Sequence, residues 1–578
     1  MKERLRAQLL AAVQDLLSQA ELSCEGIPPF ALDVPRNPEH GDFASNAALL
    51  LAKALRRSPR QVAEQLAQVL LRTCDFLAEV EVAGPGFLNF RLGRASWHTL
   101  LARILAEGES FGVSRSGEDA AAQVEFVSAN PTGPLTLGHG RQAVLGDAIA
   151  RLLTATGYRV TREYYFNDAG RQMRVLGASV KARYLEELGR AAPPPAACLA
   201  DAEAEWPTLL GGLPVVFPRD GYQGDYIRDL ALQLLEQHGE ALIDEPEDGL
   251  FRAHAQQCIF GEIRATLTAL GIHFDVYYTE TSLAENGKTE AVMRALREKD
   301  LVYDADGAVW LRATALGLPR DRVLVKRTGE STYLLPDIAY HCEKFRRGFE
   351  LVVDVQGADH IEQFPYVKEA VSALGFDGGR VELVMHQFVT LTRGGEQVKQ
   401  STRRASYVTV DELLSEIGSD VFRFFMIQRK ADGHLDFDLD LAAETDWKKN
   451  PAYYLQYAHA RACSIERKAR ELGALLPASG RLNAAPLELP EELDLLRKLG
   501  EFPEVVAGAA AAREPHHIAY YLRELAGLWH PYVQDGVRHR VLSDDAALSQ
   551  ARLALVAAVR TVFANGLALL GIRAPEQM

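Results

Sequence analysis

Three patterns of hydrophobic and polar positions follow one another along the chain. At the N-terminus, apolar residues recur at helical spacing and predict an amphipathic helix; they are Leu5, Leu9, Val13, Leu16 and Leu17. From residue 113 to about 390, short apolar runs alternate with helical stretches, which is typical of a parallel α/β sheet. From about residue 446 onward strand patterns stop, and alanine, leucine and arginine at helical spacing predict a helical bundle.

These patterns predict several domains, because one hydrophobic core rarely serves a chain of 578 residues. The predicted fold class is α/β, with a Rossmann-type parallel sheet and insertions over residues 113–390. An α+β domain over residues 1–112 precedes it. A connecting region over residues 391–445 leads to an all-α domain over residues 446–578. Residues 191–220, with three consecutive prolines, predict a poorly structured insertion or linker.

The sheet domain opens with a strand, a tight loop and a helix. Val124, Phe126 and Val127 predict the strand, and Asn130-Pro-Thr-Gly-Pro134 ends it. Apolar residues at helical spacing follow from Ala143 onward. This arrangement aims free backbone N–H groups and the positive end of a helix dipole at the loop, where a phosphate can bind.

Two residues at the start of this helix suit a nucleotide. Gly138 lets a ligand approach the backbone closely, and His139 places an imidazole donor in the first helical turn. A Gly-His pair alone also occurs in ordinary strand–helix turns, where the histidine only caps the helix. The functional interpretation therefore depends on further residues of the same sheet.

Polar loops also end the other predicted strands. These strands lie at residues 158–166, near residues 271–282, at residues 351–360 and at residues 381–387. In open α/β sheets, ligands bind at the carboxyl edge of the strands. We therefore expect the loops to form one site.

A second cationic loop lies far downstream, at residues 399–407. It contains Lys399, Ser401 and Arg403 and follows a glycine-rich turn. Such a loop suits the negative charge that develops on triphosphate oxygens during displacement at a phosphorus atom. Taken alone, the same composition would more often belong to a solvated turn.

Together the two loops resemble the paired signatures of class I aminoacyl-tRNA synthetases. The first signature, His-x-Gly-His, corresponds to Thr136-Leu-Gly-His139. The second, Lys-Met-Ser-Lys-Ser, is kept at Lys399, Ser401 and Arg403. The resemblance implies that both loops contact one ATP molecule.

The sequence departs from these signatures at Thr136, Gln400 and Thr402. At positions 136 and 402, the departure removes a side chain that can carry positive charge. Arg403, Arg404 or Lys326 would supply the missing charge, or bound tRNA would help to assemble the site.

A third group of residues suits a flat cationic substrate. Asp337 lies one helical turn after Tyr333, and Tyr340 adds a second aromatic wall. Glu280 contributes another acid, and Asn130 can hold an α-amino group. Planar, bidentate contacts to carboxylates are how a guanidinium is recognised. The alternative is that Asp337 only stabilises a helix N-terminus and that Tyr333 belongs to the core.

The start of the helical domain interleaves cations with aromatic residues. Lys448, Tyr453, Tyr457 and Arg461 are the members that we single out. Stacking on unpaired bases, with cations on phosphates, is how single-stranded RNA loops are bound. The alternative is a stripe of tyrosines that faces the core.

The whole chain, in order, resembles arginyl-tRNA synthetases of the bacterial type. Beyond the loops above, the resemblance rests on Gly41-Asp-Phe43, Gly86-Phe-Leu-Asn-Phe90 and the C-terminal stretch from Asn565 to Met578. It implies ATP-dependent activation of arginine and transfer to the terminal adenosine of tRNA(Arg), with Mg²⁺ accompanying ATP and no tightly bound cofactor. Within this family, activation generally needs bound tRNA.

The resemblance also implies roles for individual residues. Catalysis is expected from His139, Lys399, Ser401 and Arg403. ATP is expected to contact Thr136, Gly138, His139, Gly357, Asp359, His360, Gln387 and Lys399. Arginine is expected to contact Asn130, Glu280, Tyr333, Asp337 and Tyr340. The tRNA is expected to contact Phe87, Asn89, Lys448, Tyr453, Tyr457 and Arg461.

Composition narrows the remaining possibilities. Six dispersed cysteines, without a Cys-x-x-Cys pair, indicate neither a metal site nor a disulfide framework. A net charge of −15 argues against a general electrostatic grip on nucleic acid but allows local basic patches. The sequence contains no uninterrupted run of about 18 apolar residues, so it predicts no membrane span. We expect a cytoplasmic protein and, from the family, a monomer.

Two other functions stay open. One is a nucleotidyltransferase with a related sheet that makes a small adenylylated product without tRNA; the N-terminal extension and the helical domain disfavour it. The other is a weakly active paralogue of the synthetases that acts as a tRNA-binding protein, which Thr136 and Thr402 keep open.

Overall fold

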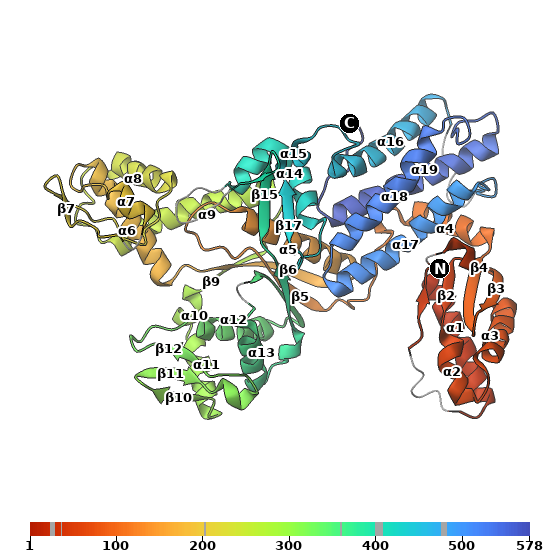
Figure 1. The fold of residues 1–578 in the computed structure, drawn as a ribbon, viewed down its shortest axis with the longest axis horizontal. Helices are drawn as coiled ribbons and strands as arrows, with labels where there is room; N and C mark the ends of the chain where they lie inside the picture. The colour runs from red at the N-terminus through yellow and green to blue at the C-terminus, as the bar shows by residue number, and fades with distance from the viewer. Residues whose placement is uncertain (23–28, 36, 202–203, 359–360, 399–407, 475–481) are drawn as a thin grey trace.

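The computed structural model describes residues 1–22, 29–35, 37–201, 204–358, 361–398, 408–474 and 482–578. Figure 1 shows an N-terminal domain, a central sheet domain that extends into two lobes, and a bundle of C-terminal helices. The N-terminal domain lies beside the helical bundle and away from both lobes.

The N-terminal domain is built on a four-stranded antiparallel sheet in the order β1-β2-β4-β3. The apolar stripe of α1 is buried, as its spacing predicts. Gly86, with φ of +142°, sits in the β3–β4 turn, where a Cβ would lie 2.8 Å from the backbone of Pro59. The elements are α1 Lys2–Gln19, β1 Leu32–Asp33, β2 Phe43–Ser45, α2 Ala47–Leu55, α3 Pro59–Thr73, β3 Leu77–Ala83, β4 Phe87–Leu92 and α4 Arg94–Glu107.

The central domain contains a five-stranded sheet in the order β14-β13-β5-β6-β9, and every neighbouring pair is parallel. All carboxyl ends therefore meet at one edge. The predicted strands are confirmed in type and in approximate place. They are β5 Ala121–Glu125, β6 Arg159–Phe166, β9 Val276–Thr279, β13 Leu351–Gly357 and β14 Val381–His386.

The first strand ends earlier than its apolar pattern predicts. β5 stops at Glu125, and Phe126 and Val127 lie beyond it. Val127 and Ser128 adopt the left-handed conformation, with φ of +66° and +40°. A β-branched residue rarely does so, because its side chain crowds the backbone there. The chain thus begins its turn inside the predicted strand.

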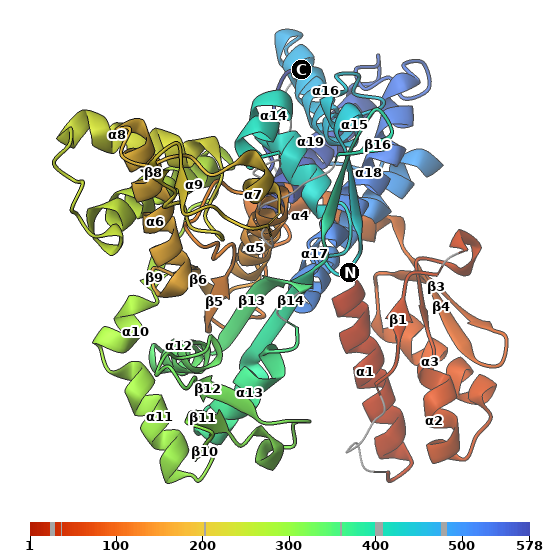
Figure 2. The ribbon, with the colours of Figure 1, turned by 60° about the vertical axis from the view of Figure 1, so that its left-hand side comes forward.

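Two insertions form the lobes. One contains α6 Gly170–Glu187, α7 Ala196–Ala200, β7 Leu209–Leu210, β8 Leu213–Pro214, α8 Asp225–His238 and α9 Arg252–Ala269. The described part of residues 191–220 contains a short helix and a two-stranded hairpin, and so has more regular structure than predicted. The other lobe holds a three-stranded antiparallel sheet and neighbouring helices (Figure 2). It consists of α10 Thr281–Glu285, α11 Lys288–Glu298, β10 Val302–Ala305, β11 Ala308–Leu311, β12 Arg322–Val325, α12 Leu334–Arg346 and α13 Phe364–Ala373.

A small connecting unit follows the sheet. β15 pairs with β16 in antiparallel and with β17 in parallel orientation. The helix α14 packs against α5 (Leu137–Ala155), the helix that follows β5. The members are β15 Val389–Arg393, β16 Glu396–Gln397, α14 Val410–Ile427, β17 Leu435–Asp438 and α15 Leu439–Ala443.

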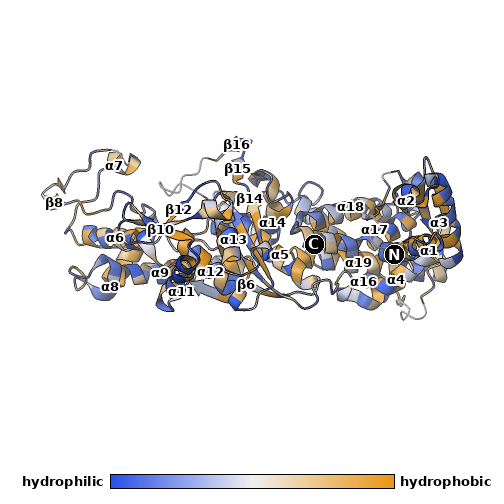
Figure 3. Ribbon diagram, turned by 90° about the horizontal axis from the view of Figure 1, so that it is seen from below, coloured by the Kyte–Doolittle hydropathy of each residue, from blue (hydrophilic) through white to orange (hydrophobic). Residues whose placement is uncertain are grey.

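The C-terminal unit is helical throughout its described part, as predicted; its helices are α16 Pro451–Glu471, α17 Pro490–Ala512, α18 His516–Gln534 and α19 Ala546–Leu569. Among the described helices, α19 alone is long and apolar enough to cross a membrane, but 72% of its apolar window is buried inside the protein. Polar and apolar residues alternate along the bundle helices (Figure 3). We infer that α19 is the core helix of the bundle.

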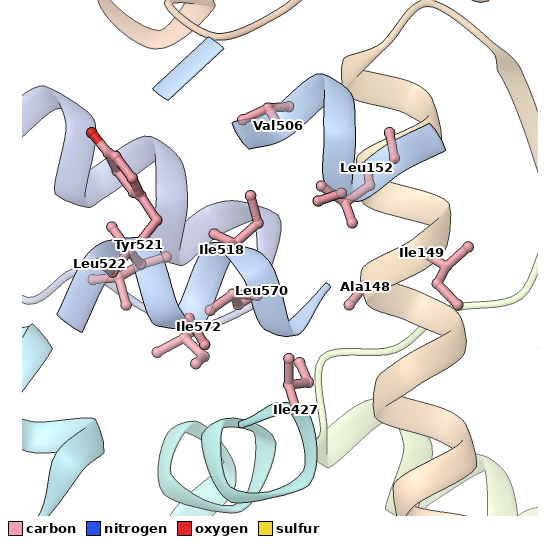
Figure 4. Close-up of a cluster of buried hydrophobic side chains, with 14 of the residues drawn as sticks. Ala148, Ile149, Leu152, Ile427, Val506, Ile518, Tyr521, Leu522, Leu570 and Ile572 are labelled. Atoms are coloured by element: carbon pink, nitrogen blue, oxygen red, sulfur yellow. The ribbon is translucent and has the colours of Figure 1, made fainter. Parts of the chain in front are cut away.

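The bundle and the sheet domain share a hydrophobic core. Figure 4 shows side chains of α5, α14 and the bundle helices meeting in one cluster. The labelled members are Ala148, Ile149, Leu152, Ile427, Val506, Ile518, Tyr521, Leu522, Leu570 and Ile572. Burial of this apolar surface holds the bundle in a fixed position relative to the sheet.

Candidate functional site

A cavity of about 740 Å³ opens at the carboxyl edge of the sheet. Residues that follow β5, β6, β9, β13 and β14 line it, together with residues of α5 and α12. It brings together eight of the predicted site residues: Asn130, Thr136, Gly138, His139, Glu280, Tyr333, Asp337 and Tyr340, with Gly357 as a ninth. The expected convergence of loops at one edge is therefore present.

Local hydrogen bonds hold the turn after β5 in its left-handed conformation. Ser128 Oγ donates to Glu125 Oε1 at 3.0 Å and accepts from the backbone N–H of Tyr165 at 3.1 Å. The hydroxyl of Tyr164 donates to the carbonyl of Ala129 at 2.7 Å. These bonds fix the backbone that leads to Asn130.

His139 occupies the first turn of α5 as a neutral imidazole. The backbone N–H of Thr136 donates to His139 Nδ1 at 3.3 Å, so Nδ1 is an acceptor and Nε2 carries the hydrogen. Burial lowers the pKa of His139 to about 4. At neutral pH the ring can therefore donate a hydrogen bond to a phosphate, but it adds no positive charge.

The glycine that close packing requires is Gly140, which the sequence did not single out. A Cβ there would lie 2.6 Å from Phe422 Cζ and 3.0 Å from Val410 Cγ2, both on α14. A Cβ at Gly138 would meet only Thr136 Oγ1, at 3.9 Å. Gly140 thus brings α14 against α5.

The chain that leaves the second signature returns directly beside the first. The backbone N–H of Val410 donates to the carbonyl of Leu135 at 2.9 Å, and Thr409 forms an antiparallel bridge with Thr136. Lys399, Ser401 and Arg403, with Gln400, Thr402 and Arg404, lie outside the described residues, as do Asp359 and His360. Where the described chain resumes after the second signature, Thr409 and Val410 lie beside residues 135 and 136.

Asp337 faces the cavity with both carboxylate oxygens supported. Gln363 Nε2 donates to Oδ2 at 3.0 Å, and His341 Nδ1 lies 3.0 Å from Oδ1 and 2.8 Å from the Asp337 carbonyl. Tyr333, at the N-cap of α12, is 66% exposed. The alternative that Tyr333 belongs to the core is therefore wrong.

The other predicted arginine contacts lie around this carboxylate. Glu280 accepts from the hydroxyl of Tyr165 at 3.0 Å, and burial raises the pKa of Glu280 above its ordinary value. Asn130 Nδ2 donates to Gln172 Oε1 at 2.5 Å. Tyr340 is buried at the floor of the cavity, and its hydroxyl donates to Glu163 Oε1 at 2.6 Å.

The described lining carries negative charge only. Glu125, Glu280 and Asp337 are acidic, and no lysine or arginine lines the cavity within the described part of the chain. Lys326, one candidate for the missing cation, lies outside this lining and 3.9 Å from Glu330. The cavity thus favours a cationic substrate, while a triphosphate needs positive charge from elsewhere.

Several lining residues were not anticipated from the sequence; they are Gln142, Gln172, Gln363, His386 and Phe388. Gln363 follows β13 at the carboxyl edge, so its place after a strand was the signal that could have found it. Gln387, predicted for ATP, is absent from the lining. Its backbone carbonyl instead accepts from Arg141 Nη1 at 2.7 Å.

The residues predicted to contact tRNA differ in exposure. In β4, Phe87 is exposed, whereas Asn89 is buried within the sheet. In the bundle, Tyr457 stacks on Trp447 with ring centroids 4.0 Å apart, and Lys448 Nζ lies 5.6 Å from the centre of the Trp447 ring.

Tyr453 and Arg461 lie further along α16. Tyr453 is half-buried and packs against the core, which agrees with the alternative that tyrosines of this stretch face the core. Arg461 is exposed. Lys448 and Arg461, together with the Trp447–Tyr457 stack, give the start of the helical domain a surface with both cationic and aromatic groups.

Sequence models of three domain families match the chain in order. "Arginyl tRNA synthetase N terminal domain" matches residues 3–92. "tRNA synthetases class I (R), catalytic domain" matches residues 100–195 and 241–431. "DALR anticodon binding domain" matches residues 455–578. The parallel sheet, its carboxyl-edge cavity and these matches define a class I aminoacyl-tRNA synthetase.

Similar proteins of known name identify the family within this class. The arginine–tRNA ligase of Desulfotalea psychrophila is 47% identical over 578 residues, which cover 100% of both chains. That of Salinibacter ruber is 47% identical over 583 residues, again covering 100% of both. The chain belongs to the arginyl-tRNA synthetases, the family of arginine–tRNA ligases. The structure of Thermus thermophilus arginyl-tRNA synthetase, 24% identical and covered over 100% of both chains with a TM-score of 0.73, has the same fold.

Proposed function

We propose that the chain ligates L-arginine to tRNA(Arg) in two steps at this cavity. The arginine carboxylate attacks the α-phosphorus of ATP, the bond to the β-phosphate oxygen breaks, and pyrophosphate leaves. A ribose hydroxyl of the terminal adenosine then attacks the carbonyl of arginyl-adenylate, and AMP leaves. The observation that carries the proposal is that the acidic pocket of Asp337 and Glu280 and the signature turn of His139 share one cavity.

Each part of the cavity has a separate task in this proposal. Asp337 and Glu280 receive the guanidinium, with Tyr333 and Tyr340 as aromatic neighbours. Asn130 holds the α-amino group. Thr136, Gly138, His139 and Gly357 contact the nucleotide, together with Asp359, His360, Gln387 and Lys399.

Positive charge for the triphosphate comes from outside the described lining. Mg²⁺ enters bound to ATP as part of the substrate, and Lys399, Ser401 and Arg403 of the second signature are the residues of the chain to which we assign this task. No tightly bound cofactor takes part. Stabilising the charge on the leaving pyrophosphate and positioning the reactants account for catalysis of such transfers.

The domains divide the binding of tRNA. We assign residues 1–112 to the elbow of the tRNA, residues 113–390 to catalysis, residues 391–445 to the second signature and the stem, and residues 446–578 to the anticodon. Phe87, Lys448, Tyr453, Tyr457 and Arg461 are the proposed tRNA contacts, and Asn89, which is buried in β4, would act only by supporting its neighbours in that strand. The protein acts as a monomer in the cytoplasm.

A charging assay over the twenty amino acids with total tRNA tests the proposal. Only arginine should be esterified to tRNA, and arginine-dependent exchange of pyrophosphate into ATP should need tRNA. Arginine-dependent exchange that ignores tRNA would favour an enzyme making a small adenylylated product. Binding of tRNA without any charging would favour the weakly active, tRNA-binding paralogue, the alternative that Thr136 and Thr402 keep open.

Restoring the signature histidine should not harm the enzyme. Thr136 is half-buried at the cavity, with Oγ1 3.2 Å from His139 Nδ1, so a ring at this position can reach the nucleotide. We expect Thr136→His to leave the rate of adenylate formation unchanged or to raise it up to about ten-fold, since one well-placed donor can be worth about 10² or more. Pyrophosphate exchange measures this rate.

The matched control for this substitution is Thr268→His on the exposed face of α9, which should leave the rate unchanged. A ten-fold fall in Thr136→His alone would show that residue 136 does not lie at the nucleotide.

A further inference from the structure

A network of buried charges lies under the arginine pocket, between α12 and the strands β5 and β13. Lys344 is fully buried, and its Nζ lies 2.7 Å from Glu125 Oε2 and 2.7 Å from Asp354 Oδ1. His341 Nε2 donates to Asp354 Oδ2 at 2.7 Å. None of these three contacts involves a residue to which the proposed function assigns a substrate.

The network of buried charges reaches the pocket at two places. On one side, His341 Nδ1 reaches Asp337, the proposed partner of the guanidinium, at 3.0 Å from Oδ1. On the other side, Glu125 Oε1 accepts from Ser128 in the left-handed turn that leads to Asn130. One connected set of side chains therefore reaches the residues proposed for the two ends of the amino acid.

Each charged group in this network is stabilised by the opposite charges of its neighbours. Burial and the nearby Lys344 disfavour a charged imidazole, but Asp354 and Asp337 outweigh them and raise the pKa of His341 to about 10. Burial acts against the charge on Lys344 too, yet Asp354 and Glu125 raise its pKa above the ordinary value. Removing one member leaves an opposite charge buried without a partner.

A separate ion pair closes the network on the side of β6. Arg347 contacts Glu163, which also accepts from Tyr340. Because Arg347 neutralises Glu163, this acid does not compete for Lys344 or His341. The only cations that contact Asp354 or Glu125 within the described residues are Lys344 and His341.

We propose that His341 and Lys344 are positioning residues for arginine: together they hold Asp337 and the Val127–Ser128 turn in the arrangement that fits the amino acid. This inference rests on the proposed function, because it takes Asp337 as the guanidinium partner. With Oδ1 supported by His341 and Oδ2 by Gln363, the carboxylate is oriented before arginine arrives. Orientation fixed in advance lowers the entropic cost of binding.

A double-mutant cycle between His341→Gln and Asp337→Asn tests the proposal. In the otherwise unchanged protein, His341→Gln should raise the KM for arginine about ten- to a hundred-fold and change the KM for ATP less than about three-fold. In the Asp337→Asn background, the same substitution should add less than about two-fold, because its effect acts through that carboxylate. Pyrophosphate exchange with saturating tRNA gives both constants.

Lys344→Met alone can prevent folding, since it leaves Glu125 and Asp354 buried without their cation. The second variant is therefore Lys344→Met combined with Asp354→Asn, which removes one charge of each sign. It should also raise the KM for arginine about ten-fold or more, with the KM for ATP nearly unchanged. The matched control is Lys288→Met. Lys288 lies on α11 and pairs with Glu343, which is on α12 next to Lys344 in the sequence, so the substitution removes an ion pair to the same helix. It should leave the KM for arginine within about two-fold.

Three results would overturn the proposal. An unchanged KM for arginine in His341→Gln would remove its basis, and so would equal rises in both constants with additive effects in the cycle. An unchanged KM for arginine in Asp337→Asn would instead show that the pocket itself is misassigned, so the proposed function and this inference would fall together. The first two results, with the KM for arginine still raised in Asp337→Asn, would refute the inference and leave the proposed function intact.

Discussion

Replacing Asp337 by alanine is expected to weaken arginine activation severely and to leave the KM for ATP within about three-fold. The substitution removes the carboxylate whose oxygens Gln363 and His341 hold toward the cavity. Truncating one partner of a buried, hydrogen-bonded charge pair costs about 2–5 kcal/mol. At 25 °C this corresponds to a loss of roughly thirty-fold to several thousand-fold in kcat/KM for arginine.

Pyrophosphate exchange with tRNA present, titrated separately with arginine and with ATP, measures both effects. Glu362→Ala is the matched control. Glu362 is an exposed acid next to Gln363 in the sequence, it does not line the cavity, and it pairs with Arg320 and Arg322 only at 3.5 Å. If Asp337→Ala kept its dependence on arginine, the guanidinium would have to bind elsewhere.

The sheet and its functional edge could be predicted because the signals are local. The central strands β5 and β13 are buried along most of their length, whereas β6, β9 and β14 are only partly buried, but all five appear as short strand-forming runs. Each run ends in polar residues or glycine, and parallel strands place all such ends at one edge. This is why Asn130, His139 and Glu280, 150 residues apart at the extremes, could be assigned to one cavity before the structure was known.

The left-handed turn after β5 could not be predicted in the same way. Val127 favours strands by composition, yet it has φ of +66°. The cause is tertiary: Tyr164 and Tyr165 of the neighbouring strand β6 and the carboxylate of Glu125 supply the hydrogen bonds that hold the turn. A single segment cannot reveal partners that a neighbouring strand provides.

The charge network shows the same limit. The spacing of Asp337 and His341 places them one helical turn apart, so their contact could have been expected. Their link to Asp354 needs β13 to lie beside α12, and the link from Lys344 to Glu125 needs β5 beside β13. Hydrophobic periodicity indicates which face is buried, but it does not indicate which charges share that buried layer.

The tRNA contacts expected in the N-terminal domain come from the family resemblance, which does not separate exposed from buried positions in a sheet. Phe87 and Asn89 lie two residues apart in β4, and yet one is exposed and the other buried. Twist and the covering of the sheet decide this, and neither is visible in the alternation of residues. At the start of the helical domain, Trp447 stacks on Tyr457 and was not singled out from the sequence.

The largest effect on stability is expected from replacing Arg423 by methionine. Arg423 is 1% exposed, and it donates to the carbonyls of Leu270 and Leu570 at 3.0 Å each and to Asp147 Oδ2 at 2.5 Å. It thereby joins α14 to α5, to the end of α9 and to the end of α19. Methionine has a similar length but leaves the buried carboxylate and two carbonyls without this donor, at a cost of about 3–5 kcal/mol. For a chain of 578 residues we expect an apparent melting temperature roughly 3–4 °C lower.

Arg151→Met is the matched control, because Arg151 binds the same carboxylate, Asp147 Oδ2, at 2.8 Å from a position that is 33% exposed. A solvent-screened pair of this kind is worth less than about 1 kcal/mol, so the melting temperature should fall by less than about 1 °C. Circular dichroism at 222 nm, followed on heating, compares the two variants. Equal shifts would mean that the charge on Asp147, rather than the three-way junction that Arg423 makes between the sheet domain and the bundle, sets the stability here. Because α14 begins at Thr409, beside Thr136, a loosened junction should also slow adenylate formation, whereas Arg151→Met should leave that rate unchanged.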